Sequence, residues 1–169
     1  GKYLYSASLD GKVLKWDLAA RTSTNVTTGA TQITSIDISS NGNYLAGINN
    51  AGNVIVWNPE NNTDNFRLET SGKNIKVIRF KPDENILALG DISGNVELWD
   101  VSSRKKITEV KAHNAQVNDI RFNPVLGQMA TASNDKTLKI FNNTADLTEP
   151  PITFTDNEGW VLVISFSND

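Results

Sequence analysis

The sequence predicts an all-β protein, and three observations support this prediction. Short apolar runs rich in Val, Ile, Leu and aromatic residues recur along the whole chain of 169 residues. Turn-forming pairs such as Asp10-Gly11 and Asn41-Gly42 separate these runs. No long segment keeps the period of about 3.6 residues that marks an amphipathic helix. The chain is therefore expected to consist of short strands joined by turns.

An internal repeat organises these strands. Four similar segments carry an aromatic residue near their end, and these residues lie 41, 42 and 42 positions apart. The segments are GKVLKWD, GNVIVWN, GNVELWD and KTLKIFN, with the aromatic residues Trp16, Trp57, Trp99 and Phe141. A second set of apolar segments, which begins at Ile33, Ile75, Val117 and Val161, follows nearly the same period. Such repetition is typical of folds in which one small unit stacks on the next.

Each repeat holds four short strand-like segments, of which the last is the most polar. A polar last strand suits the outer edge of a sheet, because it discourages pairing with other chains. We expect a single domain over residues 1–169. Repeat 1 starts at residue 1 and lacks its first strand, repeats 2, 3 and 4 start at about residues 31, 73 and 115, and residues 161–166 form the first strand of a following unit.

The period and the Trp-Asp pair that ends the third strand resemble the WD40-repeat family over the whole chain. This resemblance implies a β-propeller, in which four-stranded antiparallel blades stack around a central channel. The first strand of each repeat would line that channel. The chain is accordingly expected to contribute four WD-type repeats to a larger ring of seven or eight blades.

The resemblance also implies a structural tetrad of His, Ser or Thr, Asp and Trp, which ties a blade together through hydrogen bonds. No repeat of this chain carries all four members. Repeat 4 comes nearest, although it has Phe in the position of the Trp. The residues assigned to these tetrad positions are Ser8, Asp10, Trp16, Trp57, Trp99, His113, Ser133, Asp135 and Phe141.

The Ser, His and Asp of repeat 4 would also suit a hydrolase triad. The sequence lacks the G-x-S-x-G turn of many such enzymes, and His113 stands four residues before Val117, where the resemblance expects the tetrad His. The chain has one His and no Cys, whereas zinc sites need three or four suitable ligands. We therefore expect no catalytic residue, no metal and no cofactor.

The composition argues against two classes of partner. A formal net charge of -3 provides no general attraction for nucleic acid or for anionic membranes. The basic run from Arg104 to Lys106 is interpreted as a solvated loop. No apolar run approaches the length of a membrane span. The cellular location stays unknown, with the cytoplasm favoured.

Partners of WD40 proteins usually bind the loops before each first strand and between the second and third strands. In this chain those positions are neutral and rich in amides, which suits a protein or peptide better than nucleic acid. Trp160 is the strongest candidate, because it lies outside the aromatic repeat positions and Trp is enriched in interface hot spots. The candidate binding residues are Trp160, Gln116, Asn74, Gln32, Leu9, Asn50, Ile92 and Asn134.

The sequence thus predicts a non-catalytic interaction scaffold or sensor module that presents a propeller face to a protein or peptide. This prediction rests on the function of similar folds, so alternatives remain. The second hypothesis is a nucleic-acid or chromatin-type reader. The third is a hydrolase that uses residues of the channel.

The two ends of the chain are complementary, because the chain begins with a second strand and ends with a first strand. One chain could close as four blades, the remaining blades could come from a parent chain, or two chains could exchange their final strands. Exchange would give a symmetric homodimer with an eight-bladed ring. We favour this strand-swapped dimer over the four-bladed monomer, because two-fold homo-oligomers are the commonest kind.

Overall fold

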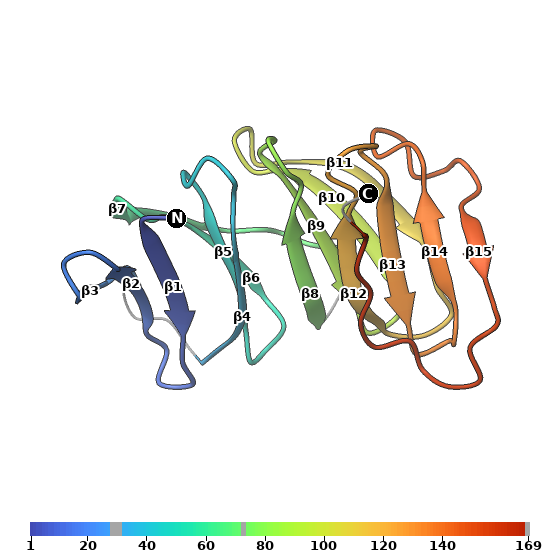
Figure 1. Cartoon of the computed structure of the whole chain (residues 1–169), viewed down its shortest axis with the longest axis horizontal. Helices are drawn as coiled ribbons and strands as arrows, with labels where there is room; N and C mark the ends of the chain where they lie inside the picture. Colours follow the sequence, from blue (N-terminus) through green and yellow to red (C-terminus); the bar gives the residue numbers. More distant parts are fainter. Residues whose placement is uncertain (28–31, 72–73, 168–169) are drawn as a thin grey trace.

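The computed structural model describes residues 1–27, 32–71 and 74–167, and within these ranges it contains strands and turns but no helix (Figure 1). None of the described residues therefore forms a helix that could cross a membrane. The strands form four antiparallel sheets, each a simple meander in which consecutive strands pair. This arrangement confirms the all-β prediction. The expected repeat starts near residues 31 and 73 fall outside the described residues.

We call the four sheets blades 1 to 4. Blade 1 has three strands, and the other blades have four each. Blade 1 comprises β1 (Tyr3–Ala7), β2 (Val13–Asp17) and β3 (Thr22–Asn25). Blade 2 comprises β4 (Ile33–Ile38), β5 (Leu45–Asn49), β6 (Val54–Asn58) and β7 (Asn61–Arg67). Blade 3 comprises β8 (Ile75–Phe80), β9 (Ile86–Asp91), β10 (Asn95–Asp100) and β11 (Lys105–Lys111). Blade 4 comprises β12 (Val117–Phe122), β13 (Met129–Ser133), β14 (Leu138–Phe141) and β15 (Ile152–Phe154).

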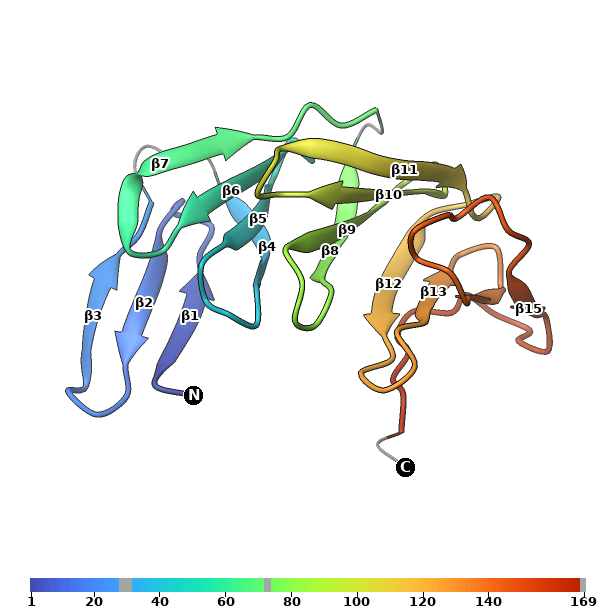
Figure 2. The ribbon, with the colours of Figure 1, turned by 90° about the horizontal axis from the view of Figure 1, so that it is seen from above.

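The blades stand side by side in an arc, with blade 1 and blade 4 at its two ends (Figure 2). Blades 2, 3 and 4 begin with an inner strand, and the outer strands β7 and β11 run along the convex side (Figure 2). The outer strands β3 and β11 are mostly exposed, as their polar sequences predict, and β15 is exposed although two of its three residues are apolar.

The core lies between neighbouring blades and is built around one large side chain in each interface. Trp57 packs against blade 1, Trp99 against blade 2 and Phe141 against blade 3. These three side chains are only 2%, 6% and 2% exposed. Trp16 occupies the same position in blade 1 but is 37% exposed, because no described blade precedes it. In blades 2, 3 and 4 the aromatic residue of the repeat is therefore an anchor that packs against the preceding blade.

A tight turn joins β1 to β2 in blade 1 and the second strand to the third in each of the other blades, and it requires a left-handed backbone. The residues at this position are Gly11, Gly52, Gly94 and Lys136, with φ of +83°, +75°, +94° and +70°. Space is also short. A Cβ on Gly52 would lie 2.3 Å from the Asn74 Cα, and one on Gly94 would lie 2.2 Å from the His113 carbonyl oxygen. Lys136 is the one residue in this set that adopts the left-handed conformation with a side chain.

Residues 161–166, the expected first strand of a following unit, are not assigned to a strand in this chain, so this expectation stays a prediction. The segment lies against blade 4, where the Val161 N–H donates to the Ser133 carbonyl at 3.0 Å. It joins no ladder, because a strand needs a partner along its length and the described residues do not form a further sheet beside it.

We predict that Lys136→Gly leaves stability unchanged or raises it by up to about 1 kcal/mol. The left-handed conformation costs a residue with a Cβ about 1–2 kcal/mol, whereas glycine adds about 0.5–1 kcal/mol of chain entropy in the unfolded state. Urea unfolding measures the difference. Lys12→Gly is the matched control, because Lys12 lies in the equivalent turn of blade 1 without a positive φ and should lose stability. A loss at Lys136 as large as that at Lys12 would contradict the argument.

Candidate functional site

The loops that the sequence singles out lie at one end of the blades. In blades 2, 3 and 4 the first residue of the inner strand pairs with the last residue of the second strand. The loop before the inner strand and the turn after the second strand are therefore neighbours. We call their surface the loop face, defined by Leu9, Gln32, Asn50, Asn74, Ile92, Gln116, Asn134 and Trp160.

Hydrogen bonds connect members of the loop face within a blade. The Asn50 N–H donates to the Gln32 carbonyl at 2.9 Å, and the Asn134 N–H donates to the Gln116 carbonyl at 3.0 Å. The side chains of Asn50 and Gln32 also meet, with 3.3 Å between Asn50 Nδ2 and Gln32 Oε1. The structure thus brings Asn50 together with Gln32 and Asn134 together with Gln116, each pair with one residue from each kind of loop.

Asn118 belongs to this network, although the sequence analysis did not single it out. Its amide Nδ2 donates to Asn134 Oδ1 at 2.7 Å and to the Val161 carbonyl at 2.9 Å, and its Oδ1 accepts from Gln116 Nε2 at 2.9 Å. The register of β12 shifts between Val117 and Asp119, so Asn118 stands out of the ladder. Its position just inside a first strand was the available signal.

Three apolar side chains of the loop face are open to solvent. Trp160 is 67% exposed, Leu9 is 64% exposed and Ile92 is 39% exposed. Leu9 belongs to blade 1 and Ile92 to blade 3, while Trp160 follows blade 4. The loop face therefore presents three separate exposed apolar side chains among amide groups.

A polar cleft of about 240 Å³ opens beside the loop face between blades 2 and 3. The Thr34 and Ser35 side chains and the exposed ammonium of Lys76 contribute to it. Asn50, one of the predicted residues, lies on its wall. The lining residues are Thr34, Ser35, Asn49, Asn50, Gly52, Ile75 and Lys76.

In blade 4 the His and Asp of the predicted tetrad are bonded to each other, but the hydroxyl member differs from the prediction. His113 is 2% exposed, and its Nδ1 lies 3.0 Å from an Asp135 oxygen. Its Nε2 lies 2.8 Å from the hydroxyl of Thr131, not from that of Ser133. Ser133 instead donates to the Ala115 carbonyl at 3.2 Å and accepts from the Asp135 N–H at 3.0 Å.

The same correction applies to blade 1. The Trp16 indole donates to the Ser6 hydroxyl at 2.9 Å, whereas Ser8 accepts from the Asp10 N–H at 3.4 Å. Trp16 is paired with Leu4 across the strands, so Ser6 is its diagonal neighbour and within reach of a long side chain. Ser8 is two residues further along the strand. The tetrad hydroxyl therefore belongs to the position of Ser6 and Thr131.

Blades 2 and 3 accommodate their anchors in other ways. Gly47 occupies the hydroxyl position of blade 2, where a Cβ would lie 2.7 Å from the Trp57 ring. In blade 3 the Trp99 indole donates to the Glu97 carboxylate at 2.8 Å, and Glu97 is 1% exposed. The indole N–H therefore provides a hydrogen bond to a carboxylate that is buried in the interface.

The electrostatics of the His113 site suit a structural role. Burial lowers the pKa of His113 below its ordinary value, and the Asp135 carboxylate offsets only part of this effect. Burial acts to raise the pKa of Asp135. Hydrogen bonds from Thr137 and the Asn114 N–H nevertheless hold this pKa well below its usual range. A neutral imidazole that donates from Nδ1 to Asp135 and accepts at Nε2 from Thr131 satisfies both ring nitrogens.

The hydroxyl of Ser133 is not bonded to His113, so the nucleophile and base of a hydrolase triad are not assembled from these residues. Within the described ranges there is also no group of three or more His, Cys, Asp or Glu side chains that could hold a metal.

Two family models match this chain. The model described as "WD domain, G-beta repeat" matches residues 21–58, and the model described as "Anaphase-promoting complex subunit 4 WD40 domain" matches residues 55–125. The chain belongs to the WD40-repeat family. The four antiparallel blades, the anchors and the contacts of His113 with Asp135 and Thr131 in blade 4 are the structural features that fit this family.

Individual WD40 relatives are distant and longer than this chain. Protein HIR1 of Yarrowia lipolytica is 30% identical over 142 residues, which cover 73% of this chain and 13% of that protein. WD repeat-containing protein SL1-17 of Schistosoma mansoni is 28% identical over 143 residues, which cover 84% of this chain and 47% of that protein. The chain thus spans less than half the length of either relative.

Solved structures establish the propeller fold. A chain in the crystal structure of the mitotic checkpoint complex superposes with a TM-score of 0.74 at 20% identity, covering 94% of this chain and 48% of that chain. The structure of U3-55K gives a TM-score of 0.78 at 16% identity, covering 95% of this chain and 50% of that chain. The arc of blades therefore corresponds to about half of a WD40 propeller.

We predict that Phe141→Trp stabilises the chain by about 1 kcal/mol, a typical net contribution of one hydrogen bond. Phe lacks the indole N–H, and Thr131, which already contacts His113, is the acceptor that a Trp at this position would meet. Urea unfolding measures the gain. In a Thr131→Val background the same substitution should bring no gain, and an equal gain there would show that packing alone is responsible.

Proposed function

We propose that this WD40 segment is a non-catalytic interaction scaffold that binds a protein or peptide through its loop face. The observation that carries the proposal is the exposure of Trp160, Leu9 and Ile92 in loops whose backbones are held by hydrogen bonds. A large apolar side chain kept in water costs free energy that a partner can recover by covering it.

Trp160 is the expected centre of the contact. The anchor positions of the repeats are Trp16, Trp57, Trp99 and Phe141, so the fold does not need Trp160 as an anchor. The residue after it, Val161, is fixed through its N–H to Ser133 and through its carbonyl to Asn118. A Trp whose backbone is already ordered loses little entropy on binding, which favours affinity.

The polar groups around these exposed apolar side chains are suited to form hydrogen bonds with a peptide backbone. Amide side chains such as Asn50 and Asn134 both donate and accept hydrogen bonds, as a peptide does. The cleft beside Asn50 adds hydroxyl groups and the Lys76 ammonium, which would accommodate a carbonyl or carboxylate of the partner. Protein interfaces usually have apolar side chains at their centre and polar groups at their rim.

A nucleic-acid or chromatin-type reader is the second candidate, but the basic run from Arg104 to Lys106, at the start of β11 in blade 3, does not favour it. The Arg104 guanidinium lies 4.2 Å from the centre of the Phe66 ring, and Lys106 pairs with Glu109 and contacts Ser71. These side chains are already engaged within the chain. A hydrolase is not proposed, because Ser133 and His113 are not bonded to each other.

Peptides selected from a random display library against the chain provide the test. Trp160→Ala should weaken the selected peptides by about 2 kcal/mol, or roughly thirtyfold in dissociation constant, as expected for a hot spot. Leu126→Ala is the matched control, because Leu126 is 66% exposed but lies in the turn between β12 and β13, at the other end of blade 4.

If the selected peptides bind the Trp160→Ala variant as tightly as they bind the parent chain, the role of the loop face is contradicted.

The dependence of binding on salt concentration separates the protein-binding candidate from the nucleic-acid reader. Affinity for a peptide should change little with ionic strength, whereas tight binding of an oligonucleotide that falls steeply with salt would favour the reader.

A further inference from the structure

The polar cleft between blades 2 and 3 is a preformed part of the fold. Blade 2 stacks on blades 1 and 3, and blade 3 stacks on blades 2 and 4, so both walls of the cleft belong to blades with a neighbour on each side. The walls are also held close together. The Ile75 N–H donates to the Gly52 carbonyl at 3.1 Å, and a Cβ on Gly52 would lie 2.3 Å from the Asn74 Cα. The cleft therefore keeps its shape before any ligand binds.

Asn49, the last residue of β5, contributes a hydrogen-bond donor to this cleft. Its side chain lies in the cleft wall, and the residue is only 8% exposed. Its Oδ1 accepts from the Ala51 N–H at 3.1 Å and from the Asn53 N–H at 2.9 Å, which fixes the orientation of the amide. Its Nδ2 has no hydrogen-bond partner among the described residues but keeps contact with solvent. The Asn49 Nδ2 is therefore available to a ligand in the cleft.

The equivalent position of blade 3 shows that the free donor is special to blade 2. Asp91 stands there, its Oδ1 accepts from two backbone N–H groups, and its Oδ2 accepts from Asn95 Nδ2 at 2.7 Å. In blade 2 the place of Asn95 is taken by Asn53, whose Oδ1 accepts from Arg67 Nη2 at 2.8 Å. Blade 3 thus satisfies the whole Asp91 side chain internally, whereas blade 2 leaves the Asn49 Nδ2 for a partner outside the chain.

Lys76 supplies the positive charge of the cleft. The register of β8 shifts between Ile75 and Val77, so the residue between them stands out of the ladder. Asn118 has the same place in β12, but its amide is already bonded to other residues of the loop face. The Lys76 ammonium has no hydrogen bond or ion pair within the described part of the chain. Among the described residues that line the cleft Lys76 is the only charged one, so no carboxylate of the cleft neutralises it.

The remaining free groups of the cleft are mainly donors. The Ser35 hydroxyl has no hydrogen bond within the described ranges. Asn50 Nδ2 uses one N–H for Gln32 Oε1 at 3.3 Å, which leaves its second N–H. Thr34 by contrast donates its hydroxyl hydrogen to the Ile48 carbonyl at 3.2 Å. An ionised carboxylate only accepts hydrogen bonds, so it complements a cleft with several donors and one cation.

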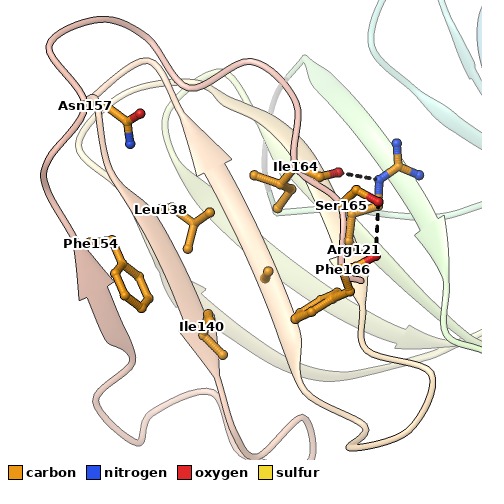
Figure 3. A pocket seen from close by; sticks show the side chains of 9 residues that line it. Arg121, Leu138, Ile140, Phe154, Asn157, Ile164, Ser165 and Phe166 are labelled. Carbon is orange, nitrogen blue, oxygen red and sulfur yellow. Dashed lines mark hydrogen bonds between the residues drawn. The ribbon is translucent and has the colours of Figure 1, made fainter. Parts of the chain in front are cut away.

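A larger pocket of about 350 Å³ beside blade 4 lacks this combination (Figure 3). Its lining includes apolar side chains such as Leu138 and Ile140. Its charged residue, Arg121, donates from Nε to Asp119 Oδ2 at 3.1 Å and to the Ile164 carbonyl at 3.2 Å. The guanidinium of that pocket is thus already paired with a carboxylate, whereas the ammonium of the cleft is not.

We propose that the cleft between blades 2 and 3 binds a carboxylate group of the partner peptide. The assignment of a peptide ligand rests on the proposed function, and the carboxylate is the chemical group that this chain selects in it. The carboxylate accepts from Lys76 Nζ and from Asn49 Nδ2. A volume of about 240 Å³ accommodates an Asp or Glu side chain or the carboxylate of a C-terminus. One ammonium balances one negative charge, so a carboxylate fits better than a phosphate, which carries nearly two.

Parallel selections from a display library of random peptides with free C-termini test this site. The targets are the parent chain and Lys76→Gln. We expect Asp, Glu or the C-terminal carboxylate to be required in the peptides that the parent chain selects, but not in those that Lys76→Gln selects. Lys105→Gln is the matched control, because Lys105 is an exposed lysine of the same blade, at the start of β11, and its loss changes the net charge equally. This control should select the same peptides as the parent chain.

Dissociation constants of one selected peptide then identify the group. Replacing its acidic side chain with the corresponding amide, and separately amidating its C-terminus, distinguishes the two sources of the carboxylate. The responsible change should weaken binding to the parent chain roughly tenfold, as expected for a hydrogen bond to a charged group, and should have little effect on Lys76→Gln. Asn49→Asp should weaken the acidic peptide at least as much, while the position of Asp91 in blade 3 shows that this turn accepts Asp.

Peptides that bind through Trp160 but need neither Lys76 nor a carboxylate would overturn the site and leave the proposed function intact. Equal losses with Lys76→Gln and Lys105→Gln would also overturn it, because the overall charge would then be responsible. Tighter binding of phosphoserine than of Asp in the same peptide would assign the cleft to phosphate instead. Acidic peptides that need Lys76 but not Trp160 would support the site and contradict the role of Trp160. No enriched peptide on the folded parent chain would contradict both proposals.

Discussion

Blades 2, 3 and 4 each depend on the burial of one large side chain against the blade before it. Trp57, Trp99 and Phe141 fill the three interfaces, and replacing such a buried ring with Ala typically costs about 3–5 kcal/mol. That is a large share of the roughly 5–15 kcal/mol by which a domain is stable. A single blade lacks this contribution on both faces. The arc is therefore a cooperative stack in which every blade completes the core of its neighbour.

The buried polar groups of the fold form hydrogen bonds within the stacked blades. Inside blade 4, His113, Thr131 and Asp135 satisfy one another, so the loop before β12 is tied to the turn before β14. In blade 3 a buried carboxylate accepts from the Trp99 indole instead. The residue pattern thus varies from blade to blade, while every described interface keeps an aromatic ring. The regular burial of an aromatic ring therefore explains how four incomplete tetrads still support one regular architecture.

The sequence predicted the fold because the spacing of the anchors is a property of the chain itself. Strand order and the position of the anchors followed from it and are confirmed. The tetrad hydroxyl was misplaced by two residues, because the choice between Ser133 and Thr131 depends on the diagonal reach across a ladder. Asn118 escaped notice because a register shift turns it out of the strand. Residues 161–166 have the sequence of a strand, but strand formation also needs a partner, which no single-chain pattern specifies. The roles of Trp160 and its neighbours stay a prediction for the same reason.

Hydrogen exchange, measured strand by strand on a sample dilute enough to contain single copies, tests the dependence on stacking most directly. Blade 3 is covered on both faces and blade 1 on only one, so local opening should be easier in blade 1. The account predicts the slowest exchange in β8, β9 and β10 and clearly faster exchange in β1 and β2, although all five strands are paired in antiparallel ladders. Equal protection of β1, β2 and β9 would contradict it, because each blade would then be stable without the neighbour that covers its anchor.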